Sequence, residues 1–169
     1  MTMQYDVKQG HLDQSGFFVK YPVRVKGFSF TGGASAGYAV LFDSLSSAVS
    51  ASVTYGRSGT TVTVSKTAHG LNTGDSIGIH FVAGTGGSAT DGTYTITKLT
   101  ADTFTVTDIN SGTITGTPAA VYAPGRFILT QEVYATNSQT YTIPGEGIRA
   151  ENGVYAYVSG LTAINITYG

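Results

Sequence analysis

Apolar and polar residues alternate along the middle of the chain, between residues 60 and 109. A period of two places successive apolar side chains on one face of a β-strand, and Gly, Asn or Asp bounds each alternating run. The pattern therefore predicts a small all-β module. Its apolar positions are Val62/Val64, Ile77/Ile79/Phe81, Tyr94/Ile96 and Phe104/Val106.

Strand-like runs also flank this module, but neither flank alone is long enough to build a complete core. A small sheet buries too little surface to offset the entropy of the chain, whereas the two flanks together would form a sandwich. We therefore expect an all-β fold: a discontinuous, jelly-roll-like β-sandwich of residues 1–56 plus 119–169, with a small β-barrel module at 57–118 inserted into one of its loops. The predicted outer strands are Phe17–Tyr21, Val23–Phe30, Tyr38–Phe42, Phe127–Tyr134, Thr140–Ile143, Val154–Val158 and Ala163–Tyr168.

The composition agrees with an all-β chain. Charged residues make up 11%, Gly accounts for 23 of 169 residues, and the hydrophobic share of 41% is enough for a core. The net charge is −1, and the sequence shows no basic surface of the kind that nucleic-acid-binding proteins use to neutralise phosphates. The basic residues Lys20, Arg24 and Lys26 are interpreted as a solvated strand face. The chain has no cysteine, which excludes disulfides and thiolate metal sites. The serine-rich segment Ser44–Ser52 is interpreted as a strand or loop edge rather than a helix.

No apolar run reaches the length of a membrane-spanning helix, and the N-terminal MTMQYDVKQGHLDQ lacks the apolar core of a secretory signal. We therefore expect a soluble protein made in a cytoplasm, with no membrane partner.

Two glycine-rich segments match catalytic or cofactor motifs. Gly33–Gly37 fits the G-x-S-x-G elbow of hydrolases, and Gly84–Ala89 fits a dinucleotide-binding loop. Both motifs require a helix to follow, whereas strand-like sequence follows each of them. We interpret both as turns between strands.

The titratable residues also form no convergent set. The histidines lie on different predicted elements, and His69, followed by Gly70 in a turn, is expected to hydrogen-bond within that turn. Glu146 and Glu151 lie among glycines in turns, where a paired-carboxylate site is not expected. We predict no catalytic, cofactor-binding or metal-binding residues and no enzymatic activity. The aspartates expected to bond turn backbone are Asp75, Asp91, Asp102 and Asp108.

Tyrosines gather towards the end of the chain. A tyrosine ring offers a large contact area with a polar tip, which suits an interface, although tyrosine is also an ordinary strand residue. If Val154, Ala156 and Val158 face the core, the intervening tyrosines lie exposed or meet another subunit. The possible interface residues are Tyr134, Tyr141, Tyr155, Tyr157 and Tyr168.

Two stretches carry a resemblance to a known group of proteins. The run Thr67–Asp75 (TAHGLNTGD), followed by DGTY at 91–94 and TFTV at 103–106, resembles a small β-barrel module of tailed-phage structural proteins. The final part, from IPGEGIR at 143–149 to INITYG at 164–169, is similar to small virion proteins of marine and cyanobacterial phages. The resemblance covers roughly half of the chain and implies no catalytic residues.

This resemblance implies a structural protein of the virion, assembled in the host cytoplasm. The leading hypothesis is a capsid decoration or cement protein that binds the major capsid protein or another virion protein. It would also bind its own copies, with a trimer as the guessed state. The alternative is a tail or head-fibre accessory protein that binds a host-surface glycan or receptor through exposed tyrosines and the 84–92 loop.

Overall fold

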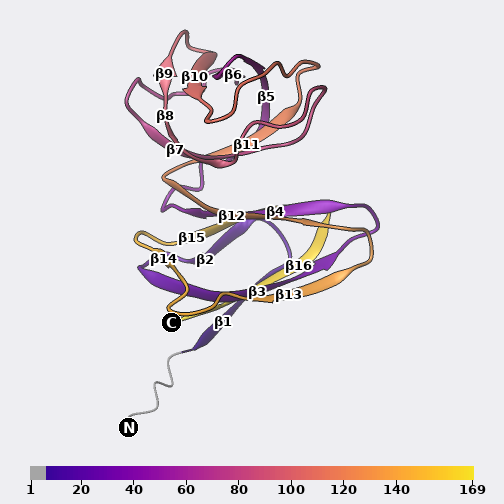
Figure 1. Ribbon diagram of the computed structural model, residues 1–169. Coiled ribbons are helices and arrows are strands. Elements are labelled where there is room, and N and C mark those ends of the chain that lie inside the picture. The colour runs from indigo at the N-terminus through magenta and orange to yellow at the C-terminus, as the bar shows by residue number, and fades with distance from the viewer. Residues whose placement is uncertain (1–6) are drawn as a thin grey trace. The chain divides into compact units, whose positions relative to one another are not determined.

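The computed structural model describes residues 7–169, and within this range the chain forms strands and no helix, which confirms the expected all-β class. Residues 1–6 lie outside the described residues. They belong to the predicted outer domain and to the N-terminal segment in which no secretory signal was expected. The chain divides into two compact units (Figure 1). The outer unit contains residues up to Ser47 and Ile128–Gly169, and the inserted unit is Ala48–Phe127.

The outer unit is a sandwich of two antiparallel sheets (Figure 1). Its strands are β1 (Lys8–Leu12), β2 (Gly16–Val19), β3 (Val23–Gly32), β4 (Gly37–Asp43), β12 (Arg126–Val133), β13 (Ser138–Thr142), β14 (Ile148–Ala150), β15 (Val154–Ser159) and β16 (Leu161–Tyr168). One sheet has the order β1-β16-β3-β13, and β14 also pairs with β3. The other sheet has the order β12-β4-β15-β2.

The strand order is that of a jelly roll. Four strands precede the inserted unit, and four follow it when β13 and β14 count as one interrupted strand beside β3. Numbered in chain order, the two sheets then read 1-8-3-6 and 2-7-4-5, the alternation produced by two interlocked Greek keys. The expected jelly-roll-like sandwich is confirmed, and the inserted unit occupies the connection between its fourth and fifth strands.

The core of the outer unit lies between its two sheets. Alternation along β3 and β16 directs Phe30 and Ile166 inwards, and Leu41 of β4 meets them from the other sheet. Each such fully buried side chain contributes about 1.5–3 kcal/mol through removal of apolar surface from water. The core therefore draws on strands from both sides of the insertion, which explains why neither flank of the sequence is complete without the other.

The inserted unit is a seven-stranded, nearly closed barrel. Its strands are β5 (Ser50–Ser58), β6 (Thr61–Ser65), β7 (Ser76–Phe81), β8 (Gly92–Thr95), β9 (Thr97–Lys98), β10 (Thr103–Thr107) and β11 (Ala119–Pro124), in the order β8-β7-β11-β5-β6-β10-β9. The two end strands, β8 and β9, are separated in the chain only by Ile96, which is buried. The Ile96 N–H donates to Asp75 O and its carbonyl accepts from Gly74 N, each at 3.0 Å. This corner brings the two ends of the sheet together.

The boundaries predicted for the module, 57–118, are too narrow. Residues 50–56 and 119–124 were expected in the outer sandwich, but they form most of β5 and all of β11, which pair with each other and with β6 and β7, inside the barrel. Tyr55 and Tyr122 of these strands belong to the barrel core. The short strands β1 and β14 were not predicted, because their sequences, KQGHL and IRA, lack an apolar alternation.

Candidate binding groove

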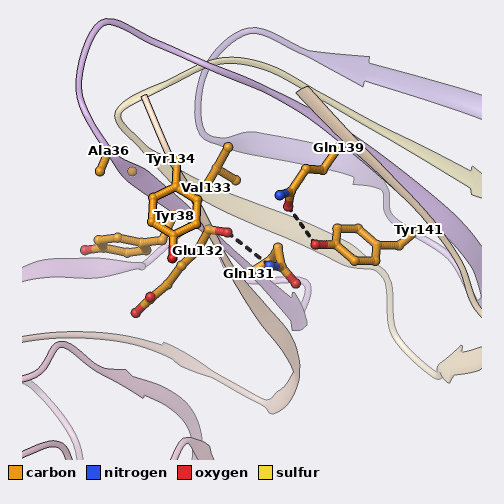
Figure 2. A pocket seen from close by; sticks show the side chains of 9 residues that line it. Ala36, Tyr38, Gln131, Glu132, Val133, Tyr134, Gln139 and Tyr141 are labelled. Atoms are coloured by element: carbon orange, nitrogen blue, oxygen red, sulfur yellow. Dashed lines mark hydrogen bonds between the residues drawn. The ribbon is translucent and has the colours of Figure 1, made fainter. Parts of the chain in front are cut away.

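A groove of about 470 Å³ opens at one edge of the sandwich, where β12 and β13 lie at the ends of their respective sheets (Figure 2). The turn at 134–137 connects these two strands. The connection between β3 and β4 also lies at this edge. The residues that line the groove are Ala36, Gly37, Tyr38, Gln131, Glu132, Val133, Tyr134, Gln139 and Tyr141.

One side of the groove is formed by β13. Tyr141 stands opposite Phe28 in the strand register, so that both rings lie on the face between the sheets. The Tyr141 ring centroid lies 5.2 Å from that of Phe28 and 6.0 Å from that of Phe30. Its hydroxyl donates to Gln139 Oε1 at 2.6 Å. Core packing and this hydrogen bond hold the ring and the amide in fixed positions, with 36% of Tyr141 exposed.

Tyr134 follows β12 and projects from a tightly bonded turn. Asn137 N donates to Tyr134 O at 3.2 Å, and Gly32 N donates to Asn137 O at 2.7 Å. Thr136 adopts a φ of 58°, and its N–H donates to Gly33 O at 2.8 Å. A Cβ at Gly32 would lie 2.6 Å from Tyr134 O, so that this close approach requires glycine. The Tyr134 side chain, 76% exposed, is thus carried by an ordered backbone.

The remaining polar groups of the groove come from β12 and β4. Gln131 Nε2 donates to Glu132 O at 3.0 Å (Figure 2). Burial, together with the neighbouring Tyr157, raises the pKa of Tyr38 to about 12, and the two rings lie 6.1 Å apart between centroids. Tyr38 therefore presents a neutral hydroxyl at physiological pH. Among the described lining residues, Glu132 alone carries a formal charge.

The five predicted interface tyrosines lie in different environments. Tyr134 and Tyr141 meet at the groove, and Tyr157 is partly buried on β15. The expectation of an exposed tyrosine face is wrong for Tyr155, which is only 8% exposed and packs edge-on against Phe17 at 4.9 Å. Tyr168 is a buried member of the sandwich core, because its position on β16 directs it inwards.

Sequence reasoning missed the other polar residues of the groove. Gln131 and Gln139 lie on consecutive strands of two different sheets, and Tyr38 comes from a distant part of the chain. Gln131 could have been found from the strand pattern. It precedes the buried Val133 by two residues, which places it on the same face of the strand. The meeting of β12 and β13 follows from the jelly-roll topology, which local patterns do not show.

In the inserted unit, Asp75 and Asp102 bond turn backbone as expected, whereas Asp91 bonds the last residue of β7. Asp75 Oδ2 accepts from Asn72 N at 2.7 Å, Asp91 Oδ1 from Phe81 N at 2.8 Å, and Asp102 Oδ1 from Ala68 N at 2.7 Å. His69 behaves as predicted, since its Nδ1 accepts from Leu71 N at 3.0 Å. Its Nε2 lies 3.0 Å from Thr100 O, which fixes the neutral tautomer with a proton on Nε2. These groups organise loops of the barrel.

Two further polar pairs are sequestered in the barrel. Arg57 forms an ion pair with Asp108, and both side chains are at most 7% exposed. Burial by itself would raise the pKa of Asp108, but hydrogen bonds from Thr90, Asn110 and Arg57 hold the pKa below its ordinary value. His80 Nδ1 lies 2.7 Å from Asp91 Oδ2. Asp91 and Asp108 belong to segment 90–110. Arg57 therefore connects this segment to β5, and His80 connects it to β7.

The glycine-rich motifs lie in turns, as expected. Ser35 is exposed between β3 and β4, and a strand rather than a helix follows it. In the second motif, Gly84 and Gly87 bond each other through both N–H groups, at 2.8 and 3.1 Å. Thr115 N also donates to Thr85 O at 3.0 Å, so that this loop is held against a neighbouring segment. Neither motif has the helix that its chemistry requires.

Comparison with known proteins identifies no relative: no family model matches the chain, and no curated protein or solved structure matches it significantly. Within residues 7–169, no three His, Cys, Asp or Glu side chains gather in a way that could hold a metal ion. The described part of the chain also contains no helix of the length and apolarity needed to cross a membrane.

Proposed function

We propose that the protein is a non-enzymatic structural protein of a phage particle, a decoration or cement protein that binds the head surface and stabilises it. The observation that carries this proposal is the jelly-roll order of the outer unit, with a separate barrel inserted between its fourth and fifth strands. Jelly rolls recur in viral capsid and lectin domains, where they present binding surfaces. The resemblance of the 67–106 and 143–169 segments to phage virion proteins supports the same assignment.

The use of the buried polar groups supports a structural role. Asp43 and Asp108 each accept hydrogen bonds from backbone N–H groups, and His69 bonds backbone on both sides of its ring. Such groups stabilise loop conformations and leave little freedom for proton transfer. A protein that works by holding a surface in place needs this kind of order.

In this proposal the outer unit binds the major capsid protein, or another protein of the shell, and copies of the chain also associate with one another. Many modest contacts repeated over a shell stabilise it through avidity, because each bound copy links neighbouring capsomers. The unpaired edges of the sandwich, at β1 and β2, offer backbone groups for such contacts. A trimer would match local threefold positions of an icosahedral shell.

The experiment is co-sedimentation of the purified protein with undecorated phage heads, or with assembled shells of the cognate major capsid protein. We expect saturable binding, with a copy number that matches the local symmetry axes of the shell. Analytical ultracentrifugation of the free protein would determine whether it is trimeric before it binds. Shells with bound protein should also resist heat better than bare shells.

Two controls make the result specific. Shells of an unrelated phage should bind no protein, and an excess of unlabelled protein should displace the labelled protein from the cognate shells. Absence of binding to cognate heads would contradict decoration and would redirect the search to the tail.

A further inference from the structure

The groove between β12 and β13 combines aromatic rings with polar groups in a way that suits one class of ligand. Tyr134 and Tyr141 present partly exposed rings, while Gln131 and Gln139 present amides between and beside them in the view of Figure 2. A sugar ring has an apolar C–H face that packs on an aromatic ring, and an edge of hydroxyls that pairs with amides. We propose that this groove binds a neutral oligosaccharide.

The size of the groove fits a short segment of a sugar chain. Small-molecule sites occupy about 300–1,000 Å³, and the groove measures about 470 Å³. It lies at the edge of the sandwich and is partly open to solvent, so that it does not enclose its ligand completely. The ligand inferred is therefore a segment of a polysaccharide rather than a free monosaccharide.

The charge of the groove selects against acidic sugars. Its described lining contains no Lys, Arg or His, and its one charged residue is Glu132, whose carboxylate points away from Gln131 and Gln139 in Figure 2. A uronate, sulfate or sialic acid would therefore find no cation in the groove to pair with. Neutral hydroxyls, in contrast, can donate to Gln139 Oε1 and can accept from Gln131 Nε2.

The backbone that carries these groups is held in place by hydrogen bonds and packing within the protein. The 134–137 turn is fixed by hydrogen bonds to Gly32 and Gly33, and the Tyr141 ring packs on Phe28. Because few groups need to be ordered on binding, a small contact area can still yield measurable affinity. This site is independent of capsid attachment, so that the two proposals can fail separately.

The test uses the full-length protein on an array of purified bacterial polysaccharides, both neutral and uronate-containing, followed by titration of each bound saccharide. We expect saturable binding to at least one neutral glycan and weaker or no binding to the acidic ones. Tyr134→Ala and Gln139→Ala should each weaken that binding about tenfold. Tyr134→Phe, which keeps the aromatic ring, should retain most of the affinity.

The matched control is Tyr21→Ala, because Tyr21 is 48% exposed but lies outside the groove. This variant should bind the glycan as the unaltered protein does, and the thermal midpoints of all variants should be compared. Three outcomes would overturn the proposal: no neutral glycan is bound, acidic glycans are preferred, or Tyr134→Ala binds as tightly as Tyr21→Ala. Co-sedimentation of Tyr134→Ala with heads reports separately on decoration.

Discussion

Asp43 is a single buried carboxylate that organises the turn between β14 and β15. Its Oδ2 accepts from Glu151 N at 2.8 Å, and its Oδ1 accepts from Asn152 N at 2.8 Å and from Gly153 N at 3.3 Å. Asp43 itself is 1% exposed at the end of β4. Hydrogen bonds to a charged acceptor are stronger than neutral ones, so that this one side chain connects two distant parts of the outer unit.

We therefore predict that Asp43→Ala lowers the free energy of unfolding by about 3 kcal/mol, because the substitution leaves buried N–H donors without an acceptor. Asp43→Asn should lose less, since one carbonyl oxygen remains. Urea denaturation followed by circular dichroism measures both values. The control is Asp13→Ala at an exposed position, expected to change stability by less than about 0.5 kcal/mol. Equal losses at positions 13 and 43 would contradict this role.

Asp108 provides a pH-dependent contribution to the stability of the barrel. Its pKa in the folded protein lies below the ordinary value of 3.8, since the hydrogen bonds outweigh the effect of burial. A lowered folded-state pKa means that the contribution is complete above the unfolded pKa and is lost as the pH falls through the folded pKa. The ion pair with Arg57 should therefore weaken only in acid.

We predict that Asp108→Asn destabilises the protein at neutral pH by about 3–5 kcal/mol, because Arg57 remains buried without its counter-ion. The difference from the unaltered protein should stay constant near neutral pH and should shrink only as the pH falls below 3.8. Unfolding measured at a series of pH values gives this difference directly and cancels the other carboxylates. A difference that stays constant over the whole series would refute the assigned titration.

At the scale of elements, the turn before β14 contains two glycines that differ in their surroundings. Gly145 and Gly147 have φ values of 70° and 76°, a region that L-residues rarely adopt. A Cβ at Gly145 would have no atom within 4 Å, whereas one at Gly147 would lie 2.4 Å from Val25 O. Position 145 therefore needs a residue that tolerates a positive φ, whereas position 147 also needs a residue without a side chain.

Accordingly, Gly145→Ala should cost about 1 kcal/mol, the penalty of the left-handed conformation alone. Gly147→Ala should cost considerably more, since β14 would have to move away from β3. Thermal unfolding of the two variants provides the comparison, and Gly145→Asn should restore part of the loss because Asn tolerates this conformation. The prediction is wrong if Gly147→Ala is no less stable than Gly145→Ala.

The sequence predicted those elements whose side chains alternate strictly. β6, β7 and β10 were expected from their buried valine, isoleucine and phenylalanine positions, and β3, β4 and β16 from similar runs. The assignment of β5 and β11 failed because strand pairing, not local pattern, decides which unit a strand joins. The sequence singled out Tyr134 and Tyr141 as possible interface residues, but it did not predict a groove, because the position of their glutamine neighbours depends on topology.

At the scale of the whole molecule, the chain builds two cores that share no residue. The core of the inserted unit centres on residues such as Phe104 and Ile79, and that of the outer unit on residues such as Phe30 and Ile166. Apart from the first two residues of β12, each unit has its own sheets, and the chain crosses between the units at 47–48 and 127–128. Units of this kind open and exchange their amide hydrogens as separate cooperative bodies.

We predict that core truncations act on one unit at a time. Phe104→Ala, which removes a fully buried ring, should cost about 3–5 kcal/mol and raise amide exchange across Ala48–Phe127. Ile166→Ala should cost about 2–5 kcal/mol and raise exchange in 7–47 and Ile128–Gly169 instead. Hydrogen exchange followed by mass spectrometry of peptides resolves the two regions. If either substitution raised exchange equally in both regions, the chain would unfold as one cooperative body, and an insertion with an independent core would be the wrong description.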